Sequence, residues 1–130
     1  MSIIFTNGCF DILHRGHIEL LRYCRSLGSE VIVGLNTDDS IRNIKGDLRP
    51  INNQADRKII LESLVYVDKV HLFDEDTPIN LINQINPDII VKGGDYSTED
   101  VVGSHRYKVL IFNYIDGYST TKIIQNIGNR

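Results

Sequence analysis

The stretch TNGCFDILHRGH, residues 6–17, decides the fold. It follows a short apolar run, residues 3–5, and precedes a segment with apolar residues at helical spacing. An apolar run, a glycine-containing turn and a helical stripe in succession are typical of a β-α unit. We therefore predict a strand over residues 2–6 and a helix over residues 17–27, which Gly28 ends.

The same alternation continues to the end of the chain. Further strands are predicted over residues 30–35, 69–73, 88–92 and 109–112, and further helices over about 53–66, 77–85 and 119–127. The helix at 53–66 is expected to bury Ile60, Leu61 and Leu64, and a polar, basic stretch through KGDLRPINN, residues 45–53, is expected to precede it. This alternation predicts one α/β domain spanning residues 1–130, with a parallel sheet and helices on both faces. The expected architecture is a Rossmann-like five-stranded sheet, for which we take the strand order 3-2-1-4-5.

Length and composition narrow the class of protein. A chain of 130 residues can bury roughly two thirds of its unfolded surface, which is enough for one core. The net charge of -3 argues against a general nucleic-acid binder, whose surface would be basic. No run of 18 apolar residues and no basic leader appear, and the two cysteines, Cys9 and Cys24, are expected to be reduced. We expect a cytoplasmic protein with no membrane partner.

The unusual residues lie where such a fold binds ligands. Open parallel sheets bind ligands beyond the carboxyl ends of their strands, at the point where the strand order reverses. Three glycine-containing turns, NGCFD, KGGDY and DGYSTT, follow the first, fourth and fifth predicted strands. They are therefore expected to share one edge of the sheet.

The HRGH segment is a candidate phosphate site. A helix start favours an anion, and His14 and His17 would add ring N–H donors there. Gly16 between them would let phosphate oxygens approach the backbone. Two ordinary surface histidines are the alternative, while a metal pair lacks further ligands, since His71 and His105 have no suitable spacing. No resident metal site is expected.

Other turns offer weaker signals of the same kind. Gly8 begins a turn whose backbone could cup a phosphate, and Asp11 could cap or orient the loop. The hydroxyl run Ser119, Thr120 and Thr121 begins the last helix; capping explains one hydroxyl, and three would make a second phosphate cradle.

Two further segments complete the candidate site. The turn at Gly93 and Gly94 would suit a flat base against main chain, although an ordinary turn is the favoured explanation of this segment taken alone. Lys45 and Arg49, in the polar loop, could neutralise phosphate charge or simply be solvated. The chain has no GxSxG, Walker A or GxGxxG motif. What remains is charge stabilisation of a direct displacement at phosphorus.

Together these motifs resemble the HxGH nucleotidyltransferase (cytidylyltransferase-like) family over nearly the whole chain. The resemblance is closest to the adenylyltransferase domain of the bifunctional heptose kinase/adenylyltransferase. It rests on TNGCFDILHRGH, NTDDS, KGDLRP, YVDKV, FDEDTP, VKGGDY and DGYSTTKII, with Arg57 between the basic loop and YVDKV.

The resemblance implies that a sugar or alcohol phosphate attacks the α-phosphate of a nucleoside triphosphate bound with Mg²⁺, releasing pyrophosphate. His14, His17 and Lys45 would be catalytic, and Asp11, Lys45 and Arg49 would meet the substrate phosphate. The nucleotide-binding residues would be Asn7, Gly8, Cys9, Phe10, His14, Gly16, His17, Lys92, Gly93, Gly94, Asp95, Ser119, Thr120 and Thr121.

ATP and D-glycero-β-D-manno-heptose 1-phosphate are the implied substrates. Cytidylyltransferases that use CTP and glycerol 3-phosphate are similar but carry arginines where this chain has Val65 and Asp116-Gly117-Tyr118, so they come second. A non-catalytic nucleotide-binding module is the alternative of another class. The segment 97–108 is shorter than in the heptose enzymes, a homodimer is possible, and a separate sugar kinase is expected because Met1 opens the first strand.

Overall fold

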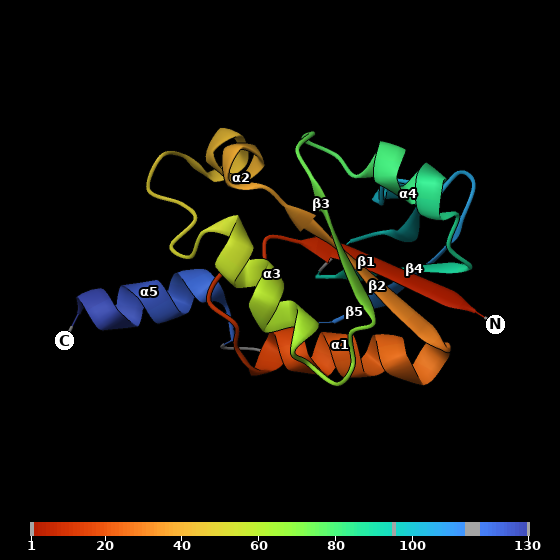
Figure 1. Ribbon diagram of the computed structural model, residues 1–130, viewed down its shortest axis with the longest axis horizontal. Coiled ribbons are helices and arrows are strands. Elements are labelled where there is room, and N and C mark those ends of the chain that lie inside the picture. Colours follow the sequence, from red (N-terminus) through yellow and green to blue (C-terminus); the bar gives the residue numbers. More distant parts are fainter. Residues whose placement is uncertain (1, 95, 114–117, 130) are drawn as a thin grey trace.

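The computed structural model, which describes residues 2–94, 96–113 and 118–129, contains a five-stranded sheet (Figure 1). All its strand pairs are parallel, and the order is β3-β2-β1-β4-β5, as predicted. The strands are β1 (Ile3–Gly8), β2 (Glu30–Asn36), β3 (Lys69–Phe73), β4 (Ile89–Gly93) and β5 (Lys108–Phe112).

The register aligns the carboxyl ends of the strands. Gly8 at the end of β1 pairs with Leu35, and Asn36 at the end of β2 pairs with Phe73 at the end of β3. On the other side of the reversal, Gly93 at the end of β4 pairs with Phe112. The turns that follow β1, β2 and β4 therefore leave the sheet at one edge.

Helices cover both faces, as predicted. They are α1 (Arg15–Leu27), α2 (Asp38–Lys45), α3 (Gln54–Glu62), α4 (Ile79–Ile85) and α5 (Thr120–Gly128), with a short 3₁₀ turn, η1 (Thr98–Asp100). One core joins α1 and α3 to the sheet through Leu21 and Leu61, and a second joins α4 to the opposite face through Ile82. Figure 1 shows α5 beginning near the start of α1 and extending away from the sheet.

A helix that was not predicted, α2, lies between β2 and the polar stretch, and Lys45, expected in a loop, belongs to it. Thr37 caps α2, because its hydroxyl accepts a hydrogen bond from the Ser40 amide, and Ile41 is buried. Lys45 is the last residue of α2 and is not in a free loop. The loop that follows, residues 46–53, therefore begins directly at the end of a helix.

The following helix also differs from its prediction. It ends at Glu62 rather than near residue 66, and Ile60 is 41% exposed although it was expected to be buried. Leu61 is fully buried as predicted, and the helix also buries Arg57, a charged residue. Cys9 and Cys24 are free thiols. Within the described part of the chain no helix is long and apolar enough to cross a membrane.

Candidate active site

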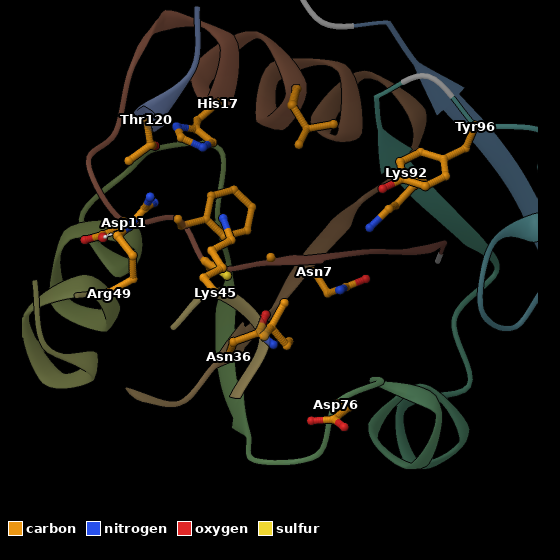
Figure 2. Close-up of a pocket in the computed structure, with 15 residues that line it drawn as sticks. Asn7, Asp11, His17, Asn36, Lys45, Arg49, Asp76, Lys92, Tyr96 and Thr120 are labelled. Atoms are coloured by element: carbon orange, nitrogen blue, oxygen red, sulfur yellow. Dashed lines mark ion pairs between the residues drawn. The ribbon is translucent and has the colours of Figure 1, made fainter. Parts of the chain in front are cut away.

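A cavity of about 360 Å³ opens at the carboxyl edge of the sheet, beside the strand reversal (Figure 2). Most of the predicted site residues line it: Asn7, Gly8, Cys9, Phe10, Asp11, His17, Lys45, Arg49, Lys92 and Thr120. Sequence reasoning missed Leu20, Asn36, Ile44, Asp76 and Tyr96, which also line it. Turns far apart in the sequence thus share one cavity.

The two histidines form the N-terminal cap of α1. The Gly16 amide donates to His14 Nδ1 over 3.0 Å, and the His14 amide donates to His17 Nδ1 over 3.2 Å. Because each Nδ1 accepts a backbone hydrogen bond, each neutral ring carries its proton on Nε2. The ring centroids lie 3.9 Å apart, with His17 on the cavity wall and His14 packed against it. The pair therefore presents two Nε2–H donors.

Burial keeps these rings neutral in the free protein. It is the main cause that lowers the pKa of His17 to about 4, with smaller contributions from His14 and Lys45. Burial also lowers the pKa of His14. A bound polyphosphate would act in the opposite direction, because a nearby anion favours the imidazolium. The cap therefore holds uncharged donors that an anionic ligand can polarise.

Position 16 requires glycine for a steric reason that the sequence did not reveal. A Cβ on this residue would lie 2.8 Å from His14 Cε1 and 2.9 Å from its Nδ1. Any side chain at position 16 would therefore displace the His14 ring from its cap. The glycine protects the geometry of the histidine pair, in addition to leaving the helix start open.

The turn after β1 is held in an uncommon conformation. Phe10 has φ 45°, is 5% exposed, and its ring lies 5.3 Å from the His17 ring. Gly8 makes room for it, since an added Cβ there would lie 3.1 Å from Phe10 Cε2. Burial raises the pKa of the Cys9 thiol, which keeps it protonated at neutral pH. The turn therefore offers backbone and shape rather than a nucleophile.

Arg57 fixes this turn from behind. Its side chain is fully buried and donates to the carbonyls of Asn52, Cys9 and Asn36 at 2.8 to 2.9 Å. Its Nη2 also pairs with the Asp38 carboxylate at 2.8 Å. One guanidinium therefore ties together the ends of β1 and β2, the start of α2 and the loop before α3. The sequence around Arg57 in α3 did not indicate that its side chain is buried in this role.

Asp11 holds the loop that carries Arg49. Its carboxylate, 3% exposed, accepts from the amides of Ile51 at 2.7 Å and Asn52 at 2.9 Å, and lies 3.5 Å from Arg49 Nε. That nitrogen is buried and makes no hydrogen bond with the described residues. Lys45 and Arg49 both line the cavity and bring two cations to it. The geometry of Asp11 suits its predicted role of orienting the loop.

The start of α5 lies next to the histidine pair. Ser119 is the cap, because its hydroxyl accepts from the Lys122 amide at 3.0 Å. The Thr120 hydroxyl donates to the Ile12 carbonyl at 3.0 Å and lines the cavity, whereas Ser119 and Thr121 do not line it. The Tyr118 ring stacks 6.3 Å from the His14 ring. Two helix N-termini, each favourable for an anion, therefore converge here.

The end of β4 closes the opposite side. Lys92 lines the cavity, and its Nζ lies 5.1 Å from the centre of the Tyr96 ring. Burial lowers the pKa of Lys92. Gly93 and Gly94 do not line the cavity, and the Gly94 amide donates to the Phe112 carbonyl. Asp95, Asp116 and Gly117 lie outside the described residues.

The cavity suits a metal that arrives with its substrate. No cluster of three or more His, Cys, Asp or Glu side chains suitable for a metal occurs within residues 2–94, 96–113 and 118–129. Asp76 supplies one exposed carboxylate on the wall. Mg²⁺ is commonly bound by one or two carboxylates together with substrate phosphates and water, so these residues fit a nucleotide-borne Mg²⁺.

This sheet, with two helix starts that favour an anion and several cations around one cavity, is suited to binding a phosphate-bearing ligand. The family model described as cytidylyltransferase-like matches residues 5–126. The chain therefore belongs to the cytidylyltransferase-like family.

Two relatives and one solved structure show which members of the family the chain is similar to. The chain is 52% identical over 127 residues to the bifunctional protein HldE of Campylobacter concisus (strain 13826) and 50% identical over 127 residues to that of Helicobacter pylori (strain P12). Each match covers 97% of this chain, which spans 27% and 28% of their lengths. The crystal structure of the lipopolysaccharide core biosynthesis protein from Thermoplasma volcanium GSS1 has a TM-score of 0.75 and 28% identity. That match covers 92% of this chain and 99% of the other.

Proposed function

We propose that residues 1–130 act as one adenylyltransferase domain, which transfers AMP from ATP to D-glycero-β-D-manno-heptose 1-phosphate and releases pyrophosphate. The observation that carries the proposal is the shared cavity, in which His17, Lys45 and Thr120 face one space although they come from distant parts of the sequence. The identity of about 50% to HldE proteins supports a heptose phosphate as acceptor. Such a reaction draws on cytoplasmic ATP.

The reaction is a direct displacement at the α-phosphorus. An oxygen of the acceptor phosphate forms the new P–O bond, and the bond from the α-phosphorus to the bridging oxygen breaks as pyrophosphate leaves. The Nε2–H groups of His14 and His17 would donate to the α-phosphate as its negative charge develops. Preorganised donors of this kind commonly supply the largest part of the rate enhancement.

Other residues would position the two substrates. The free N–H groups at the start of α5, beside Thr120 on the cavity wall, would hold the outer phosphates, and Lys92 would neutralise charge from the opposite wall. Lys45 and Arg49 would bind the acceptor phosphate, and Asp11 would hold the loop that carries Arg49. Bringing both substrates into contact converts a bimolecular step into an effectively unimolecular one.

Mg²⁺ would be held mainly by the triphosphate, with Asp76 as the protein carboxylate available to it. When bound, it would offset charge on the phosphate oxygens. The acceptor is a sugar 1-phosphate, which a kinase that phosphorylates the anomeric hydroxyl of a sugar would supply.

The test is an assay of pyrophosphate release. The protein is incubated with Mg-ATP and D-glycero-β-D-manno-heptose 1-phosphate, and we expect stoichiometric pyrophosphate and ADP-heptose. Release only with CTP and glycerol 3-phosphate would favour a cytidylyltransferase. Binding of ATP without turnover on any sugar phosphate would favour a nucleotide-binding module.

The variant His17→Ala distinguishes an enzyme from a nucleotide-binding module in this assay. In an enzyme it should lower kcat by more than tenfold, about 1.4 kcal/mol, and leave the KM for ATP nearly unchanged, because the donor acts on developing charge. His71→Ala, an exposed histidine on β3, is the matched control and should keep full activity.

A further inference from the structure

A second cavity, of about 180 Å³, opens beside the first. The two share Asn7, Asp76, Lys92 and Tyr96 as walls, so they form adjoining compartments. Figure 2 shows these four side chains on the side of the site away from Asp11 and Arg49. The rest of the second cavity comes from Thr77 and Pro78, just before α4, and from residues 100–102, where η1 ends and the chain leaves it.

We propose that this second cavity holds the sugar ring of the acceptor and that Asp100 is a specificity-determining residue that binds its hydroxyls. The inference rests on the proposed function, because it assigns the acceptor's place in the same site. Asp100 lines the second cavity and not the first, so its effect can be separated from that of the catalytic groups.

The distribution of charge indicates which end of the acceptor lies in which cavity. Lys45 and Arg49 line only the first cavity, and Lys92 stands at the boundary. Among the described residues, the second cavity is lined by two acidic residues, Asp76 and Asp100, and by one cation, Lys92. A phosphate is therefore favoured in the first compartment and repelled from the far end of the second. Sugar hydroxyls are donors, and a carboxylate accepts them in charge-assisted hydrogen bonds.

Size and shape agree with this assignment. The second cavity has half the volume of the first, about 180 Å³ against about 360 Å³, so it suits the smaller of the groups that the two substrates bring. Val101, which is buried, and Pro78 give an apolar surface for the C–H face of a sugar ring, while Asp100 and Thr77 supply polar groups. An apolar wall with a few placed polar groups is typical of small-molecule sites.

The experiment compares Asp100→Ala and Asp100→Asn with the unchanged protein. The assay measures pyrophosphate release while heptose 1-phosphate and Mg-ATP are varied in turn. Glu99→Gln is the matched control, since Glu99 is the adjacent exposed acidic residue and does not line the second cavity. Asp100 is exposed, so the variants are expected to fold, and their thermal midpoints are measured to verify this.

We expect Asp100→Ala to raise the KM for heptose 1-phosphate at least tenfold, with the KM for ATP within twofold and Asp100→Asn in between. Glu99→Gln should match the unchanged protein. An acceptor KM within twofold in Asp100→Ala would overturn the inference and leave the proposed function standing. A rise in the KM for ATP instead would assign the cavity to the nucleotide and also overturn it. If the unchanged protein releases no pyrophosphate with any sugar phosphate, the proposed function itself fails.

Discussion

At the scale of single residues, the histidine pair depends on hydrogen bonds that fix its protons. Both Nδ1 atoms accept backbone N–H groups, so the exposed nitrogen of each ring is a donor without any charge. Gly16 permits this arrangement, because its missing side chain leaves room for the His14 ring. The HxGH pattern is therefore one local unit in which the glycine is as specific as the histidines.

Gly16→Ala tests this unit. The added Cβ would lie 2.8 Å from His14 Cε1, so the ring must leave its capping position, and we expect kcat to fall at least tenfold while the protein stays folded. Gly128→Ala is the control, because an added Cβ there meets nothing within 4 Å. Steady-state kinetics of the two variants measure the effect. Equal activity in both would show that the His14 cap is not needed for turnover.

At the scale of elements, Arg57 joins the segments that shape the cavity. It lies on α3 and bonds to residues at the ends of β1 and β2, in α2 and in the preceding loop. Removing it would leave the Asp38 carboxylate and three carbonyls without their donor, and breaking a buried pair in this way is strongly destabilising.

Arg57→Met should therefore lower the free energy of unfolding by about 3 to 5 kcal/mol. Arg57→Lys should also be destabilised, because one ammonium cannot reproduce the planar fork that reaches several acceptors. Lys58→Met, which removes a surface pair with Glu62, is the control and should change stability by about 1 kcal/mol or less. Urea denaturation measures all three variants. A stability loss in Arg57→Met no larger than that of the control would contradict this role.

The elements also mark the limit of what the sequence predicts. The strands follow from local alternation, which leaves their order open because doubly wound sheets occur with more than one order. The placement of the site follows from the turns at the strand ends. Helix α2 was missed because its turns show only Ile41 and Ile44 as apolar residues, and its Thr37 cap was the available signal. Arg57 was not foreseen as buried, because its partner Cys9 lies 48 residues away and no local pattern encodes such a contact.

At the scale of the whole molecule, burial of His17 links the site to global stability. The pKa of this ring falls from its ordinary value of 6.5 to about 4 on folding, mainly through burial. The folded state therefore binds fewer protons than the unfolded state between these values. The stabilisation is complete above pH 6.5 and is lost as the pH falls toward 4, by on the order of 3 kcal/mol in total.

His17→Gln should remove this part of the pH dependence. Between pH 7 and pH 4 the unchanged protein should lose about 3 kcal/mol more stability than the variant does, measured by urea unfolding at a series of pH values. His105→Gln, at an exposed position in the segment before β5, serves as the control and should follow the unchanged protein. Parallel curves for His17→Gln and the unchanged protein would mean that the ring titrates normally in the fold.

The central claim is that both imidazoles of the cap meet the nucleotide held in the first cavity. The most direct measurement is a ¹⁵N NMR spectrum of the four histidine rings during titration with Mg²⁺ and a non-hydrolysable ATP analogue. We predict that the signals of His14 and His17 shift together and saturate, whereas those of the exposed His71 and His105 stay in place. Unmoved His14 and His17 signals at saturating nucleotide would contradict the account.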